Sequence, residues 1–246
     1  PHFSFFLQIH FTLATPCHIG GSELFYIHEC SQLKDLAFKV PMLPPSSWKG
    51  HFRYAATRLI QEGEKEAVVE RLFGAGAEEA MEKEEALGQG RLRFYPTFFD
   101  TIGLDLINPH SRRTKAGTVP ILEEIATPGA KGVLSLLYIP VDLLGGLDLD
   151  KAKKQVKEDL FFTYAILKDV LHTYGFSAKN ARGFGLAQYK YSKILNGGKE
   201  APGGFLEMAG VPVYKEAEKP ESGKDNTFSY LNQLKRIVDK IANKLS

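Results

Sequence analysis

The sequence has little cysteine, no long apolar run and almost no net charge, and each of these absences excludes a class of protein. Its two cysteines, Cys17 and Cys30, cannot build a disulfide framework in 246 residues, so a reducing compartment, the cytoplasm, is expected. No apolar run approaches the roughly 20 residues that span a bilayer, so we expect no membrane partner. Apolar residues alternate from Phe3 onward, which favours a strand over a signal peptide. The 31 basic and 29 acidic residues leave a net charge of +2, so a basic surface requires local segregation of charge.

The common catalytic and metal-binding motifs are also missing. The chain has no His-Glu-x-x-His motif, no paired-cysteine metal motif and no Gly-x-x-x-x-Gly-Lys-Ser/Thr phosphate loop. Its seven histidines are scattered, so we predict no metal site. One acid/base cluster remains, in which His28 and Glu29 precede Asp35 in the first long loop, although a loop histidine is more often an ordinary surface residue.

The apolar pattern predicts two strands and two helices in the first 99 residues. Period-two alternation over 3–13 predicts a strand with one buried face, and an irregular stretch follows over 18–45. A helix is expected next, with Ser46 or Ser47 as its N-cap. Its apolar stripe comprises Trp48, Phe52, Ala55, Ala56, Leu59 and Ile60. A second helix over 64–72 should stop at Gly74, and 91–99 should form a second strand.

In the rest of the chain we expect a loop over 100–120 and then two paired segments, 121–127 and 131–140, joined by Pro128 and Gly129. The longest helix should run from Asp150 to Tyr174, followed by a glycine-rich loop and a strand near 184–194. Residues 196–226 show little periodicity and indicate a surface excursion, and Phe228 to Leu245 should form an amphipathic helix.

This order of strand, helix, strand, strand, helix and strand predicts an α+β fold of the ferredoxin-like or RRM-like type. We expect one domain over 1–195 with insertions at about 16–45 and 100–120, and a linker plus C-terminal helix over 196–246 packed on the same domain. Insertions of this length in a compact domain are usually functional.

Two segments combine helix or loop geometry with positive charge. In the first, over 44–53, a helix N-terminus and two serine hydroxyls favour phosphate binding, and Lys49 and Arg53 lie one turn apart on a common face. A capped helix with solvated cations is the alternative. In the second, over 175–185, glycines permit close backbone approach to a ligand, with Lys179, Asn180 and Arg182 supplying charge and polarity; a flexible connection is the alternative.

A third segment, 108–117, is a basic loop without an apolar anchor. It carries His110, Arg112, Arg113 and Lys115, and such loops are usually solvated. Together with the other two segments, however, it makes up a recognisable order along the chain. That order includes a Pro-x-Ser-Ser-x-Lys-Gly-x-x-Arg helix, Leu-Phe-Gly at 72–74, and Glu-Ile at 124–125 followed by Gly129 and Gly132.

From about residue 3 to 191 the chain resembles the RAMP superfamily of CRISPR-associated proteins, in particular backbone subunits of type III and type III-derived effector complexes. The resemblance implies a modified RRM core, the palm, with an inserted thumb near 108–118. It implies that copies stack along a CRISPR guide RNA, hold a complementary target RNA and contact other subunits. Guide phosphates would be held by Ser46, Ser47, Lys49, Arg53, Lys179, Asn180 and Arg182, with His110, Arg112, Arg113 and Lys115 on the thumb.

The resemblance also bears on cleavage. In many type III backbone subunits an Asp in the first long loop supports metal-dependent cutting of the paired target, and Glu29 is the matching residue here, with Asp35 or Glu23 as alternatives. The longer side chain would misplace the carboxylate, which disfavours intrinsic cleavage and leaves it to a separate nuclease subunit. Binding then needs no cofactor, and Mg or Mn would be required only for intrinsic cleavage. A guide-processing endoribonuclease using His28 or His51 is the third hypothesis.

Overall fold

The computed structural model describes residues 3–21, 30–60, 66–74, 89–117, 119–145, 148–188, 204–208, 227–228 and 231–245. Its centre is an antiparallel sheet ordered β10-β9-β1-β7-β3, in which β8 also pairs with β1. The strands are β1 (Phe5–Leu13), β3 (Leu92–Phe94), β7 (Lys131–Tyr138), β8 (Ala187–Gln188), β9 (Gly204–Met208) and β10 (Thr227–Phe228).

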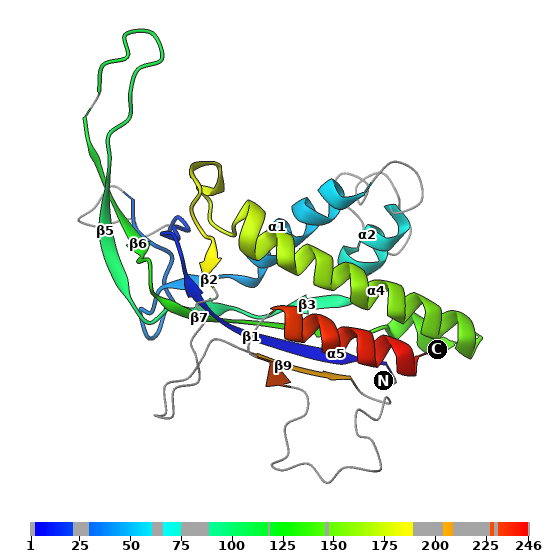
Figure 1. Ribbon diagram of the computed structural model, residues 1–246. Helices are drawn as coiled ribbons and strands as arrows, with labels where there is room; N and C mark the ends of the chain where they lie inside the picture. The colour runs from blue at the N-terminus through cyan, green and yellow to red at the C-terminus, as the bar shows by residue number, and fades with distance from the viewer. Residues whose placement is uncertain are drawn as a thin grey trace.

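Helices cover one face of this sheet (Figure 1). They are α1 (Pro45–Leu59), α2 (Glu66–Phe73), α4 (Leu149–Asp169), which continues as a π-helical turn over Val170–Tyr174, and α5 (Leu231–Lys244). The core chain order β1-α1-β3-β7-α4-β9 and the spatial order β9-β1-β7-β3 are those of a ferredoxin-like fold, so the predicted fold class is confirmed. No helix among the described residues is long and apolar enough to cross a bilayer.

The core follows the predicted periodicities. Alternate residues of β1 and β7 point to the helices and are buried: Phe5, Leu7, Ile9, Phe11, Leu13, Leu134, Leu136 and Tyr138. From α1 the predicted stripe supplies Trp48, Phe52, Ala55 and Ala56, all fully buried. Aromatic side chains provide much of the apolar area removed from water in such a core.

A buried ionic network lies where β3 and β7 meet α2 and α4. Asp159 of α4 is fully buried and accepts hydrogen bonds from Arg91 (2.8 Å), the Tyr138 hydroxyl (2.7 Å) and Arg71 (3.0 Å). Buried charge needs this degree of pairing, because removing ions from water is costly. The network locks the helical layer to the sheet, and burial beside the Asp159 carboxylate raises the pKa of the Tyr138 hydroxyl.

A second hairpin stands apart from the central sheet. It consists of β5 (Ile102–Ile107) and β6 (Ile121–Ala126), paired over six residues, and it projects from the body of the molecule (Figure 1). The short strands β2 (Met42–Leu43) and β4 (Thr97–Phe98) form a separate pair just before α1 begins.

Several element predictions were wrong. The N-cap of α1 is Pro44 rather than Ser46 or Ser47, because Pro45 suits the first helical position with its fixed φ. Pro96 divides the expected strand 91–99 into β3 and β4, which belong to different sheets.

The expected loop 100–120 contains β5, whose alternation over 102–107 is brief. The predicted pairing of 121–127 with 131–140 was therefore wrong. The strand within 121–127 pairs with β5, and 131–138 pairs with β1 and β3 in the central sheet. Near 184–194 only Ala187–Gln188 is a strand, and 189–194 lies outside the described residues. Within the expected excursion 196–226, residues 204–208 form β9, and Phe228 belongs to β10, three residues before α5 begins. The helix predicted over 150–174 and the stop at Gly74 (φ 80°) are confirmed.

Candidate nucleic-acid interface

The start of α1 presents a positive helix end without a compensating acid. Pro44 is extended, its carbonyl accepts from the amides of Ser47 (3.1 Å) and Trp48 (3.3 Å), and the first turn contains no acidic residue. Ser46 is exposed and Ser47 half-buried, so the side chain of Ser46 lies open to solvent. The partial positive charge of a helix N-terminus is therefore available to an anion here.

Three cations converge beside this helix end. Burial lowers the pKa of the Lys49 ammonium group, and the nearby guanidinium groups of Arg53 and Arg93 lower it further. Arg93, on β3, was not among the predicted site residues. It is fixed by hydrogen bonds to the carbonyl oxygens of Gly90 and Leu92. Mutual repulsion of this kind marks a positive potential that a polyanion would relieve.

The glycine-rich segment is a tightly closed loop. Gly175, Gly183 and Gly185 have φ near 76–79°, the left-handed region that glycine adopts without strain. The Phe176 amide donates to the Gly185 carbonyl at 3.0 Å, and a Cβ on Gly185 would lie 2.5 Å from the Ser177 nitrogen. Such close packing argues against a merely flexible connection between α4 and β8.

The cations of this loop face an internal carboxylate. Glu123 of β6 is fully buried and forms an ion pair with Lys179, and Arg182 lies 3.9 Å from its other oxygen. Arg182 also stacks over the Phe184 ring, 5.1 Å from its centroid, and is about half exposed. Burial lowers the pKa of Lys179, and Arg182 acts in the same direction. Lys179 and Arg182 are therefore held at the loop surface, while Asn180 lies half-buried between them.

A polar anchor beneath the loop was missed at the sequence level. His18 is buried and its Nδ1 lies 2.8 Å from the Glu124 carbonyl, while its own backbone amide and carbonyl both bond the Ser177 hydroxyl. Burial lowers the pKa of His18. Glu124 in turn accepts hydrogen bonds from the Gln32 amide (3.1 Å) and the Lys34 ammonium (3.0 Å). Glu123 and Glu124 are adjacent acids inside the apolar run 121–126, and this is the sequence signal that indicates a buried polar cluster.

The predicted thumb residues occupy the tip of the β5–β6 hairpin. His110 pairs with Gly117 across the tip, and His110, Arg112, Arg113 and Lys115 are all exposed. Lys115 has φ 58°, which closes the turn. The hairpin carries these charges well away from the sheet (Figure 1).

Of the catalytic residues predicted in the first long loop, the structure describes only Asp35. His28 and Glu29, with the alternative Glu23, lie outside the described residues. Asp35 caps a surface turn, where its Oδ1 accepts from the amides of Ala37 (3.0 Å) and Phe38 (2.8 Å). Within the described ranges no group of three or more His, Cys, Asp or Glu side chains could hold a metal ion.

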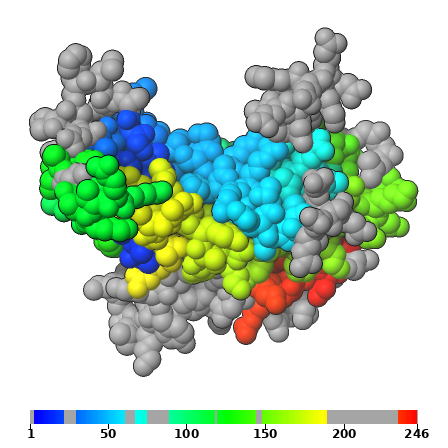
Figure 2. Space-filling view, turned by 90° about the horizontal axis from the view of Figure 1, so that it is seen from above, coloured from blue at the N-terminus to red at the C-terminus, as the bar shows by residue number. Residues whose placement is uncertain are grey.

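The segments predicted to bind RNA lie next to one another in the structure. The Trp48 ring of α1 packs against the Phe176 ring of the loop, with centroids 4.7 Å apart, and the Glu123–Lys179 ion pair joins the loop to the hairpin. Figure 2 shows the glycine-rich loop (yellow) between the hairpin (green) and α1 (blue to cyan). Three segments far apart in sequence, each carrying exposed cations, thus lie side by side.

Solved structures that share this fold include two subunits of type III CRISPR complexes. A chain of the type III-B Cmr-beta complex bound to cognate target RNA matches with a TM-score of 0.51 and 18% identity over 76% of this chain. The present chain spans only 58% of that one. A chain of the Csm3–Csm4 subcomplex of a type III-A CRISPR–Cas interference complex matches with a TM-score of 0.52 and 16% identity, covering 97% of this chain and 96% of the other.

No curated protein matches the sequence. The family model of the RAMP superfamily matches residues 10–188, from the middle of β1 through the glycine-rich loop to β8. The chain belongs to the RAMP superfamily.

Proposed function

We propose that this protein is an RNA-binding backbone subunit of a CRISPR effector complex, which stacks with further copies of itself along a guide RNA and holds the guide–target duplex. Family membership and the two structural neighbours support the proposal. The observation that carries it is the packing of α1 against the glycine-rich loop through Trp48 and Phe176, because each of these two elements carries predicted phosphate-binding cations. Contacts to phosphates grip any guide regardless of its sequence.

We assign the following roles within the proposed interface. Lys49 and Arg53, with Arg93 beside them, face phosphates at the start of α1, and the serine hydroxyls donate there. Lys179, Asn180 and Arg182 hold a neighbouring stretch of backbone. Cleavage of the paired target is assigned to a separate nuclease subunit, and the complex works in the cytoplasm.

The test compares two charge-reversed double variants for assembly on a single-stranded guide RNA. Lys49→Glu with Arg182→Glu should abolish binding at moderate salt, measured by fluorescence anisotropy. Lys154→Glu with Lys240→Glu, at exposed lysines of α4 and α5, makes the same change in net charge and should weaken binding only slightly. Equal affinities for the two variants would refute the assignment of this surface.

A second measurement addresses cleavage. The purified protein with guide and paired target should leave the target intact in Mg²⁺ or Mn²⁺ until a nuclease subunit is added. Metal-dependent cutting by the protein alone that disappears in Glu29→Ala would show that the subunit is itself the endoribonuclease.

A further inference from the structure

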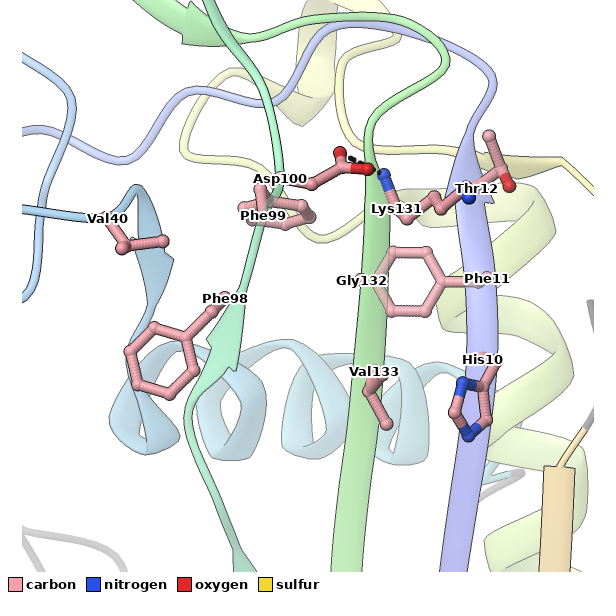
Figure 3. A pocket seen from close by; sticks show the side chains of 10 residues that line it. All are labelled: His10, Phe11, Thr12, Val40, Phe98, Phe99, Asp100, Lys131, Gly132 and Val133. Carbon is pink, nitrogen blue, oxygen red and sulfur yellow. Dashed lines mark hydrogen bonds between the residues drawn. The ribbon is translucent and has the colours of Figure 1, made fainter.

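A pocket of about 370 Å³ opens on the face of the central sheet opposite the helices (Figure 3). The register explains its position, because Thr12 pairs with Lys131 and His10 with Val133, and all four side chains point away from the buried core. The remaining wall comes from the β2–β4 side, with Val40, Phe98 and Asp100. The volume lies within the range of small-ligand sites, about 300–1,000 Å³.

One wall of the pocket is an exposed aromatic ring. Phe98 retains 45% of its surface exposed, and Figure 3 shows its ring below Val40, on the far side of β4 from Val133 and His10. Val40 and Val133 extend the apolar surface on either side. Proteins that bind single strands stack unpaired bases on exposed aromatic rings, and Phe98 offers such a ring on β4, beside the central sheet.

The rim of the pocket supplies both hydrogen-bond acceptors and hydrogen-bond donors. One oxygen of the Asp100 carboxylate accepts from the Lys131 amide at 2.8 Å, which fixes the carboxylate and leaves its second oxygen to accept from a base N–H. The Lys131 side chain and His10 are exposed and can donate to a phosphate or a base edge. An apolar side chain of a protein partner could not form hydrogen bonds with this fixed carboxylate or with the cation beside it.

The floor of the pocket is rigid and connected to α1. A Cβ on Gly132 would lie 2.8 Å from the tip of the Phe11 ring and 3.1 Å from Phe99, so the floor packs without space to collapse. The Trp48 indole N–H donates to the Thr97 hydroxyl (2.9 Å), which donates to the Val133 carbonyl (2.7 Å). This chain of hydrogen bonds fixes β7 relative to the helix that carries Lys49.

The pocket also lies close to the start of α1 along the chain. Phe98 pairs with Met42, and Pro45 follows Met42 by three positions, at most roughly 10 Å of backbone. A single RNA strand that passes the helix end is therefore within reach of the pocket.

We propose that this pocket binds one unpaired base of single-stranded RNA, stacked on Phe98, with the Asp100 carboxylate at the base edge and Lys131 at the adjoining phosphate. The inference rests on the proposed function in that its ligand is RNA. It adds a base-binding subsite on the face of the sheet opposite the helices, close along the chain to the proposed phosphate contacts of α1.

The test uses single-stranded RNA carrying one 4-thiouridine, photo-crosslinked to the protein and mapped by mass spectrometry, together with anisotropy measurements of affinity. We expect a crosslink within 98–100 or at His10. Phe98→Ala should remove that crosslink and weaken binding about tenfold, the size of one base-stacking contact. Phe98→Leu, which keeps apolar volume but no ring, should weaken binding similarly. Tyr95→Ala, equally exposed but outside the pocket, should leave affinity within about twofold.

The outcomes separate this inference from the proposed function. If Lys49→Glu with Arg182→Glu weakens RNA binding while Phe98→Ala and Phe98→Leu do not, and no crosslink maps to the pocket, the base subsite is wrong and the proposed function stands. Loss of self-association in Phe98→Ala with unchanged RNA affinity would assign the pocket to a protein contact and overturn the inference. If the unaltered protein binds no RNA, both proposals fail.

Discussion

The buried carboxylate of Glu123 forms an ion pair with the ammonium group of Lys179, which ties the projecting hairpin to the glycine-rich loop. The charge of Lys179 is therefore already paired within the protein, and the charge of Arg182 is partly paired with the same carboxylate. A phosphate that approaches this loop competes with, or adds to, an existing charge pair. The contribution of the loop to RNA affinity should accordingly be smaller than that of Lys49 and its neighbours.

This pair should be strongly coupled in stability. Lys179→Met leaves the Glu123 carboxylate buried beside only Arg182, and we expect it to lower the free energy of unfolding by about 3 kcal/mol. Glu123→Gln should cost less, because the Lys179 side chain is one quarter exposed and its ammonium can turn to solvent. Lys179→Met with Glu123→Gln should be more stable than Lys179→Met alone. Urea denaturation of the four proteins measures the coupling, and strictly additive effects would show that the ion pair is not a stabilising contact.

The network around Asp159 offers a comparison between neighbouring residues. Asp159→Asn removes the charge that Arg91 and Arg71 share in the interior, and should cost about 3–5 kcal/mol in the free energy of unfolding. Glu158→Gln removes a partly exposed partner of Arg71 and should cost about 1 kcal/mol or less. Thermal unfolding of the two variants provides the test. Equal losses would mean that burial does not determine the strength of these pairs.

The cations at the hairpin tip should affect RNA binding without affecting stability. In a triple variant, Arg112, Arg113 and Lys115 are all changed to alanine. The magnitude of the slope of log affinity against log salt should fall by about 2, roughly 0.7 for each lost phosphate contact to a single strand. Replacement of the exposed Lys151, Lys154 and Lys235 removes the same charge and should leave the slope nearly unchanged. A slope that is the same in both triple variants would remove the tip from the interface.

His18 should titrate below the ordinary histidine pKa of 6.5, because burial outweighs the hydrogen bond to the Glu124 carbonyl. A histidine whose pKa is lower in the folded than in the unfolded state binds fewer protons when folded, so its contribution to stability is present above about pH 6.5 and is lost as the pH falls. Titration of the imidazole signals by NMR gives the pKa directly. A midpoint at or above 6.5 would show that the site accommodates the charged ring.

The parts of the fold that the sequence predicted are those with a long, regular apolar period. The strand containing Phe5 and Phe11 and the helix containing Trp48 and Phe52 each bury one face, and burial imposes the period directly. Strands β3, β4 and β9 have only two to five residues, too short for a period to be distinct, and their pairing is set by tertiary contacts. The position of β6 depended on its partner, β5, which the sequence shows only as a brief alternation.

In the candidate site, too, local patterns were predicted and long-range contacts were not. The two basic segments over 44–53 and 175–185 were identified from residue type and spacing, and the structure brings them together. Arg93 and Glu123 were missed because each acts on a residue 44 or more positions away in sequence, and no local pattern indicates such a contact. Glu123 is informative in retrospect, since an acid within an apolar strand requires a buried partner.

One further consequence comes from the edge of the sheet beside β1. The two strands β8 and β9 occupy successive lengths of this single edge: β8 pairs with Thr12 and Leu13, and β9 with residues 5–9. Gln188 therefore ends, and Gly204 begins, a strand that pairs with the same side of β1. We expect a fluorescent protein or affinity tag inserted between these two strands to leave the described strand pairing intact.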